Sequence, residues 1–116
     1  MKVIIAGSRS ITDYTTVLKA VAQAIYNGFV ITEVVSGCAR GVDRLGEQWA
    51  ASTDLPVKRF QAEWIRFGKS AGIRRNVQMA EYADALIAVW DGKSRGTQNM
   101  IDTARESGLI VHVVVL

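Results

Sequence analysis

Residues that could bind a phosphate gather in three polar stretches of the sequence. Each stretch follows an apolar run and combines glycine, a hydroxyl side chain and an arginine. Backbone amides at a helix start and guanidinium groups both bind phosphate in proteins. The candidate ligand-binding residues are Gly7, Ser8, Arg9 and Asp13 in the first stretch, Ser36, Gly37, Arg40, Gly41 and Asp43 in the second, and Asp91, Ser94, Arg95, Gly96 and Thr97 in the third.

Each stretch taken alone is ordinary turn and helix-capping chemistry. Together they favour phosphate binding over a purely structural role. An arginine beside a helix start is repelled by the helix dipole unless an anion or a carboxylate lies between them. Asp43 and Asp91 fit two roles equally well, a hydrogen bond to a ribose hydroxyl or a salt bridge to Arg40 or Arg95.

A basic segment without acidic residues lies further along the chain. It contains Arg66, Lys69, Arg74 and Arg75. Such a segment suits phosphate, on a small nucleotide or on a nucleic acid. A solvated helix face explains Arg66 and Lys69 equally well. Among the aromatic residues Trp64 is the candidate for stacking on a base, although aromatic side chains more often belong to a core or its rim.

The cysteine and histidine content excludes several kinds of site. Cys38 is the only cysteine and His112 the only histidine. An internal disulfide, a cysteine-clustered metal site and a histidine-based triad are therefore excluded, and we expect no metal and no cofactor. We interpret Cys38 as a small filler and His112 as a satisfied or surface histidine of a strand.

The bulk composition is that of a soluble globular protein. The 116 residues are 49% hydrophobic and 22% charged, with a net charge of +3, and we expect one domain spanning residues 1–116. No apolar run approaches the roughly 18 residues of a membrane span. The start, MKVIIAGSRS, becomes polar too early for a secretory signal. We therefore expect a cytoplasmic protein with no membrane partner.

Apolar runs alternate with stretches of helical periodicity. This alternation predicts an α/β fold, a Rossmann-like three-layer α/β/α sandwich with a parallel sheet of about five strands and the ligand site at the carboxyl ends of the strands. We expect strands at 2–7, 32–35, 56–60, 84–90 and 109–116, and a loop at 61–69. The expected helices bury Val17, Val21 and Ile25; Val42, Leu45 and Trp49; Ile73, Val77 and Ala80; and Met100, Ile101 and Ala104, with caps at Thr12 or Asp13 and at Thr97.

The stretch SGCARGVD resembles the SG-x-ARG-[AVI]-D signature shared by DNA-processing proteins that load recombinase and by the small YspA/YpsA-related proteins. The start IIAGSRSITD and the long segment AEWIRFGKSAGIRRNVQMAEYADALIAVWDGKSRGT are similar to the small group. This resemblance covers essentially the whole chain. It implies a Rossmann-like domain of the SLOG superfamily that binds a nucleotide or a nucleotide-derived small molecule and forms a homodimer or a larger homo-oligomer.

The chain also resembles the LONELY GUY phosphoribohydrolases. RNVQM and GKSRGTQNM echo their R-K-x-x-M and P-G-G-x-G-T-x-x-E motifs, so the resemblance implies ligand-binding roles for Arg75, with Asn76 beside it, and for Gly96 and Thr97. Met100 stands where that motif has its glutamate. A thioether cannot supply the carboxylate chemistry of glycosidic cleavage, although Asp43 or Asp91 could substitute for it.

Three functions follow from these residues, and no catalytic residue is assigned. The first is binding of a nucleotide-derived small molecule, such as an ADP-ribose or NAD-related compound, for sensing, carrying or sequestering it. The second is a nucleoside-monophosphate N-glycosidase. The third is binding of single-stranded nucleic acid, which the ARG signature suggests and the small net charge of +3 disfavours.

Overall fold

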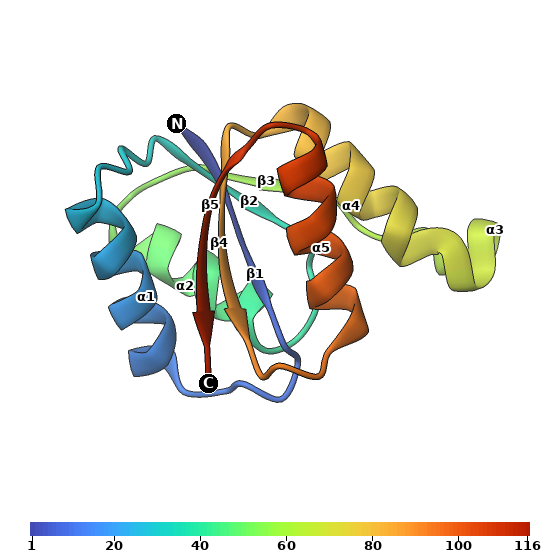
Figure 1. Ribbon diagram of the computed structural model, residues 1–116, viewed down its shortest axis with the longest axis horizontal. Coiled ribbons are helices and arrows are strands. Elements are labelled where there is room, and N and C mark those ends of the chain that lie inside the picture. The colour runs from blue at the N-terminus through green and yellow to red at the C-terminus, as the bar shows by residue number, and fades with distance from the viewer.

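The protein is a five-stranded parallel sheet with helices on both faces (Figure 1). The computed structural model covers residues 1–116. No helix has the length and apolar character needed to span a membrane. The elements in chain order are β1 (Lys2–Gly7), α1 (Tyr14–Tyr26), β2 (Glu33–Ser36), α2 (Val42–Ser52), β3 (Val57–Arg59), α3 (Trp64–Phe67), the 3₁₀ turn η1 (Gly68–Ser70), α4 (Ala71–Tyr82), β4 (Ala85–Trp90), α5 (Arg95–Glu106) and β5 (Ile110–Val115).

The strand order is β3-β2-β1-β4-β5, and every neighbouring pair is parallel. The predicted α/β Rossmann-like fold is confirmed. Strands β1 and β4 lie at the centre because their continuous apolar runs suit burial on both faces. Along β1, Val3 and Ile5 pack into the cluster under α1 and α2, whereas Ile4 and Ala6 pack into the cluster under α4 and α5.

Helix capping agrees with the sequence at one predicted site and differs at another. Asp13 caps α1 and accepts a 3.0 Å hydrogen bond from the backbone amide of Thr15. The predicted cap of α5 at Thr97 is wrong. Ser94 is the cap, and its Oγ accepts from the Thr97 backbone amide, which lies in the first turn of the helix. Thr97 itself is buried inside the first turn.

The predicted loop at 61–69 is wrong from Trp64 onward. Helix α3 and the 3₁₀ turn form there, and with the start of α4 they make an arm that projects away from the sheet (Figure 1). The predicted burial of Ile73 and Val77 is also wrong, because these side chains are 54% and 40% exposed. Helical spacing places residues on one face of a helix but does not show what covers that face. The buried residues of α4 are Ala71, Asn76, Met79 and Ala80.

Two further predictions of burial and pairing differ from the structure. Ile25 is 47% exposed near the end of α1, whose buried face is formed by Val17, Ala20, Val21 and Ala24. His112 on the edge strand β5 is half-buried with its ring edge-on to Phe29. Its Nε2 atom is buried without a hydrogen-bond partner, so the alternative of a satisfied histidine is wrong. The alternative of a surface histidine fits better, because His112 lines an open groove between α1 and β5. The remaining predicted core residues are buried or partly buried.

Candidate ligand-binding site

A cleft of about 740 Å³ opens at the carboxyl ends of β1 and β4. These neighbouring strands are followed by α1 and α5, which cover opposite faces of the sheet (Figure 1). The chain therefore leaves the two strand ends in opposite directions, and such a switch point is where α/β sheets bind their ligands. Ten predicted residues line this main cleft: Gly7, Arg9, Arg40, Asp43, Arg75, Asn76, Asp91, Ser94, Gly96 and Thr97.

A second, smaller cleft of about 240 Å³ adjoins the main cleft. Arg9, Ala39 and Arg75 line both, and the predicted residues Gly37 and Trp64 line the small cleft only. Sequence reasoning missed Ala6, Ser10, Thr12, Ala39, Met79 and Met100 in the main cleft and Cys38, Gln61 and Ala62 in the small one. Ser10 and Thr12 belong to the same polar stretch as Arg9, so their place in that stretch could have identified them as candidates. Five predicted residues line neither cleft: Ser8, Asp13, Ser36, Gly41 and Arg95.

Ser8 and Asp91 join the loops that follow β1 and β4. The buried Ser8 hydroxyl accepts a 3.0 Å hydrogen bond from the Asp91 backbone amide. The Asp91 carboxylate in turn accepts bonds of 2.8 Å from the backbone amides of Ser94 and Lys93, and these lower its pKa. It forms no salt bridge to Arg95, so that alternative is wrong. Asp91 closes a turn at the rim of the main cleft.

The glycines of the loops have two different roles. A Cβ at Gly7 would lie 2.0 Å from the carbonyl oxygen of Val89, and one at Gly41 would lie 2.6 Å from that of Ser8. Gly41 also has a φ of +79°, which favours glycine. These two glycines let neighbouring backbones pack closely. Gly96 has no atom within 4 Å of its Cβ position, so it leaves open space in the main cleft.

Asp43 is the buried carboxyl group of the main cleft. It lies in the first turn of α2 at 5% exposure, and its Oδ2 accepts a 3.2 Å hydrogen bond from the Ala39 backbone amide. Burial raises its pKa to about 6, because a low-dielectric site disfavours the charged form. Asp43 makes no salt bridge to Arg40, so that alternative is also wrong.

Arg75 connects α4 to the loop that follows β2. Its Nη1 donates a 2.6 Å hydrogen bond to the carbonyl oxygen of Gly37, and its Nε donates a 3.0 Å bond to Asn76. Burial lowers the pKa of its guanidinium, nearby Asp43 raises it, and nearby Arg9 lowers it. The ion pairs of the structure are Arg59–Glu47 and Arg66–Glu63. The charges of Arg9, Arg40 and Arg75 are therefore not neutralised by a protein carboxylate at ion-pair distance.

Asn76 joins α4 to α5 beneath the main cleft. Its Nδ2 donates a 2.9 Å hydrogen bond to Asn99 Oδ1 and a longer one of 3.5 Å to the Gly96 carbonyl oxygen. Asn76 is 4% exposed. Since a buried amide is costly without partners, these bonds hold the start of α5 in place against α4.

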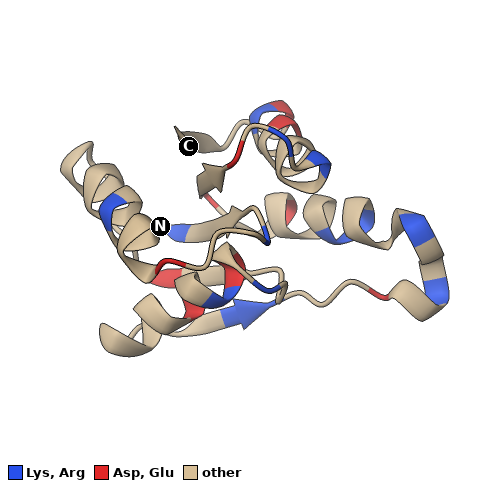
Figure 2. Cartoon of the chain, turned by 90° about the horizontal axis from the view of Figure 1, so that it is seen from below, with Lys and Arg blue, Asp and Glu red and all other residues tan.

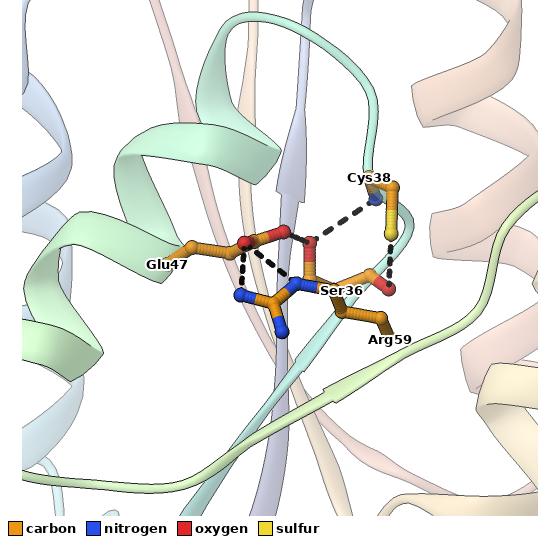
Figure 3. A network of polar contacts seen from close by, with 4 residues as sticks. All are labelled: Ser36, Cys38, Glu47 and Arg59. Carbon is orange, nitrogen blue, oxygen red and sulfur yellow. Dashed lines mark hydrogen bonds and ion pairs between the residues drawn. The ribbon is translucent and has the colours of Figure 1, made fainter.

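A polar network beside the small cleft fixes the loop that follows β2 (Figure 3). The buried Ser36 hydroxyl donates a 2.6 Å hydrogen bond to Glu47 and accepts one of 3.1 Å from the Cys38 backbone amide. Arg59 donates to the same Glu47 carboxylate at 2.8 and 2.9 Å. This network holds Cys38 at a φ of +66°, which is unusual for a residue with a side chain. Burial, and next Glu47, raise the pKa of its thiol.

Trp64 lies on α3 and forms a wall of the small cleft. It is half exposed, and its Cη2 atom lies 3.3 Å from the Cβ position of Gly72. A larger residue at Gly72 would push the indole away. The absence of a side chain on α4 therefore lets the Trp64 ring sit near Arg75.

Comparison with known proteins agrees with this architecture. Residues 1–67 match the model of the family described as YspA, cpYpsA-related SLOG. A relative of similar length, the Gene 61 protein of Mycobacterium phage D29, is 34% identical over 95% of this chain and 93% of its own. The chain belongs to the YspA, cpYpsA-related SLOG family. No solved structure matches the chain. SLOG membership points to nucleotide-related binding or to glycosidase activity.

The main cleft of this SLOG protein carries Met100 where a phosphoribohydrolase has its glutamate. Met100 is 2% exposed and belongs to the core cluster under α4 and α5. Asp43 and Asp91 are the carboxylates that line the cleft. The Asp91 carboxylate already accepts hydrogen bonds from the backbone amides of Ser94 and Lys93. The structure contains no group of three histidine, cysteine, aspartate or glutamate side chains that could hold a metal ion.

Proposed function

We propose that this SLOG protein binds a nucleotide-derived small molecule, such as an ADP-ribose or NAD-related compound, in the two adjoining clefts. The observation that carries the proposal is the set of three arginines, Arg9, Arg40 and Arg75, that line one cleft and form no ion pair. Asp43 is the one buried carboxyl group near them, so the three positive charges exceed the negative charge that it can supply. Gathering like charges in a concave site is unfavourable unless an anion neutralises them. Phosphate groups supply that charge and accept bidentate hydrogen bonds from guanidinium.

The start of α5 supplies the second group of phosphate donors. The first turn of a helix leaves backbone amides without intrahelical partners, and the helix dipole favours an anion there. Ser94 caps the Thr97 amide, and Gly96 leaves room beside the remaining amides. In the proposal a phosphate accepts from these amides while Arg75 and Arg9 contact it from α4 and from the loop after β1.

The small cleft gives the ligand a second binding region. Arg9 and Arg75 line both clefts, so a phosphate or diphosphate held between them joins one moiety in each cleft. The half-exposed Trp64 indole is the stacking surface for a base in the small cleft, and the ribose and any further phosphate occupy the main cleft. Stacking on an aromatic side chain is a common means of binding a base.

Isothermal titration calorimetry with a panel of ligands tests the proposal. We expect at least one of the four phosphorylated ligands ADP-ribose, NAD, AMP and ribose 5-phosphate to bind. Adenosine, which lacks phosphate, should bind far more weakly. The variant Arg75→Gln should weaken binding about 10- to 100-fold, the range expected for a lost charged hydrogen bond. Arg74→Gln is the matched control, because Arg74 is the adjacent exposed arginine and lines neither cleft.

Two outcomes would reject this function. One is the absence of heat with every phosphorylated ligand, together with no small molecule detected by mass spectrometry of the purified protein. The other is binding of single-stranded oligonucleotides that weakens steeply with salt and exceeds that of every mononucleotide, since this is the behaviour of a nucleic-acid binder.

Asp43 favours a second candidate function, N-glycoside hydrolysis of a nucleoside monophosphate. A carboxyl group with a pKa of about 6, buried in the cleft, has the properties of a general acid that protonates a leaving base. The bond between the base and C1′ of the ribose would break as the base takes the proton of Asp43, and water would add to C1′ and return a proton to Asp43, which gives ribose 5-phosphate and free base. Chromatography of AMP after incubation tests this function. Release of adenine that Asp43→Asn abolishes supports it, and intact AMP rejects it.

A further inference from the structure

Two carboxyl groups line the main cleft, and they differ in burial and in bonding. Asp91 lies at the rim, where the backbone amides of Lys93 and Ser94 donate to it and lower its pKa. Asp43 is 5% exposed, accepts a hydrogen bond from the Ala39 amide and forms no ion pair. Asp91 is therefore ionised at every pH near neutral, whereas the charge of Asp43 depends on the groups that surround it.

The guanidinium of Arg75 lies near the Asp43 carboxyl group but does not pair with it. A Cβ at Gly37 would lie 2.9 Å from both Arg75 Nη1 and Asp43 Oδ2, so these two atoms are no more than twice that distance apart. Nη1 already donates a 2.6 Å hydrogen bond to the Gly37 carbonyl oxygen, and this bond holds the guanidinium in place. At a separation of about 4 to 6 Å, a positive charge still favours the ionised form of a carboxyl group.

The charge of Asp43 is set by its burial, by two backbone amides and by two arginines. Burial is the largest effect and raises its pKa to about 6, because a low-dielectric site disfavours the charged form. The groups that lower the pKa are, in decreasing order, the Ala39 amide, the Arg75 guanidinium, the Gly7 amide and the Arg9 guanidinium. A change in any of these interactions near neutral pH therefore changes the fraction of Asp43 that is ionised.

Other titratable and charged groups also lie near Asp43. The Cys38 thiol is neutral near pH 7, because burial raises its pKa from an already alkaline value. Glu47 on α2 is paired with Arg59, and Arg40 and Asp91 line the cleft with opposite charges. Figure 2, seen from the side on which the strands of Figure 1 end, shows both basic and acidic segments at this end of the molecule. None of these groups supplies Asp43 with an ion-pair partner.

A phosphate between Arg9 and Arg75 would change the surroundings of Asp43 in three ways. It neutralises the guanidinium charges that favour the carboxylate, it places negative charge in the cleft, and it displaces water from the cleft. Each of these changes disfavours a second negative charge beside the phosphate. We propose that the liganded protein holds on Asp43 a proton that the free protein lacks near neutral pH, so that ligand and proton bind together. The coupling rests on the proposed binding function and gives it a dependence on pH.

The coupling fixes the direction of the pH dependence. Below about pH 5, Asp43 is protonated with or without the ligand, so its proton does not make the affinity depend on pH. Above about pH 6, the free protein loses this proton while the complex keeps it, and the affinity falls by up to about tenfold for each pH unit. Linkage is reciprocal, so the ligand strengthens proton binding by the same factor by which the proton strengthens ligand binding. The main cleft therefore binds its ligand more tightly at mildly acidic than at alkaline pH.

Calorimetric titration with ADP-ribose, and with AMP in parallel, counts the proton. Titrations at about pH 7 in buffers of different ionisation enthalpy give the number of protons that bind with the ligand. We expect the wild type to take up about 0.5 to 0.9 proton with each ADP-ribose, and its dissociation constant to rise about 10- to 100-fold between pH 5 and pH 8. The diphosphate of ADP-ribose keeps a constant charge over this range, so the change belongs to the protein.

Asp43→Asn assigns the proton to one residue. The variant should lose the proton uptake, bind ADP-ribose with an affinity that hardly depends on pH, and bind more tightly than the wild type at alkaline pH. With AMP, whose own phosphate titrates, the difference between wild type and Asp43→Asn isolates the contribution of the protein. Asp91→Asn is the matched control, because it removes the other cleft carboxylate, which is ionised throughout. This variant should take up as many protons as the wild type.

Nuclear magnetic resonance of the Asp43 carboxyl carbon adds an independent measurement, and its titration should move to higher pH when the ligand is bound. Binding without proton uptake, or equal uptake by wild type and Asp43→Asn, would overturn the coupling and leave the proposed function intact. Weaker binding by Asp43→Asn at every pH would also overturn it, because the ligand would then need the carboxylate itself. Absence of binding by every phosphorylated ligand would reject the proposed function and the coupling together.

Discussion

Nη1 of Arg75 donates a 2.6 Å hydrogen bond to the carbonyl oxygen of Gly37, and these residues are 38 positions apart in the sequence. The bond joins α4 to the loop after β2 at the wall that the two clefts share. A Cβ at Gly37 would lie 2.9 Å from both Arg75 Nη1 and Asp43 Oδ2. Gly37 is therefore the point where a cationic and an acidic side chain from two helices converge on one loop.

The variant Gly37→Ala should disturb this convergence. The added methyl group moves the Arg75 guanidinium, because the end of a long side chain yields more readily than the backbone. We expect loss of about 1 to 3 kcal/mol of unfolding free energy, the usual range for a lost hydrogen bond to a charged group. Binding of a phosphorylated ligand should weaken in parallel. Urea denaturation and calorimetry measure the two effects, and wild-type values for both would contradict the role given to Gly37.

Two glycines of the site should respond in opposite ways to alanine. At Gly7 the Cβ would lie 2.0 Å from the backbone oxygen of Val89, so Gly7→Ala should destabilise by about 3 kcal/mol or more. At Gly96 nothing lies within 4 Å, so Gly96→Ala should keep or raise the stability of α5 by up to about 1 kcal/mol. Its methyl group takes ligand space, and we expect about tenfold weaker binding. Thermal melts and titrations distinguish the pair, and a Gly96→Ala protein that binds normally would show that the ligand does not approach α5.

Asp43 should make stability depend on pH. Its pKa of about 6 in the folded protein exceeds the value of about 3.9 in an unfolded chain. The folded state therefore binds this proton more tightly. The contribution of Asp43 to stability is fully present below about pH 4 and is lost as pH rises through about 6, by about 3 kcal/mol in total.

The Asp43→Asn variant isolates this effect from the other titrating groups. At pH 7 it should be more stable than the wild type by a comparable amount, and the difference should vanish near pH 4. Denaturant midpoints measured across this range test the expectation. Asp102→Asn, at an exposed carboxyl of α5, is the control for the removal of one carboxylate charge. Parallel curves for wild type and Asp43→Asn would show that Asp43 is not protonated in the folded state near pH 5.

Ser36 should matter for the loop rather than for the ligand. Its buried hydroxyl bonds both Glu47 and the Cys38 amide, so Ser36→Ala leaves the Cys38 amide without this partner and removes one bond to Glu47, which keeps Arg59. We expect a loss of about 1 to 3 kcal/mol and faster hydrogen exchange at the Cys38 amide. Ser107→Ala, at the exposed end of α5, is the control and should behave as wild type. Unchanged exchange at Cys38 would show that the network does not hold the loop.

Trp64 should contribute to binding only when the ligand carries a base. A stacked base contributes about 1 to 3 kcal/mol, so Trp64→Ala should weaken the binding of AMP or ADP-ribose about 5- to 150-fold. Ribose 5-phosphate should bind as before, since it does not reach the small cleft. Ile65→Ala, the adjacent exposed position of α3, is the control. An equal loss of affinity for ligands with and without a base would show that Trp64 stabilises the arm and does not stack on a base.

The sequence alone predicted the strands and every helix except α3 and the 3₁₀ turn, and it predicted the carboxyl ends of the strands as the place of the candidate site. Continuous apolar runs suit strands that are buried on both faces, and the polar stretches after them occupy the carboxyl ends of β1, β2 and β4. Local chemistry also identified Asp13 as a cap, because its partner amide lies two residues away. The sequence also showed that Met100 replaces the glutamate of the phosphoribohydrolase motif, because such a comparison of motifs needs only the residue types.

The tertiary structure decided which polar residues face the clefts and which hold the loops together. Ser8, Ser36 and Gly41 belong to the same stretches as Arg9 and Arg40, yet their contacts are with other loops and with α2. The contacts that separate these roles join segments far apart in the sequence, such as Arg75 with Gly37. Helical periodicity likewise grouped Ile73 with Val77 but could not show that the arm leaves them exposed. Burial depends on what packs against a face, and residue spacing within one segment carries no information about that.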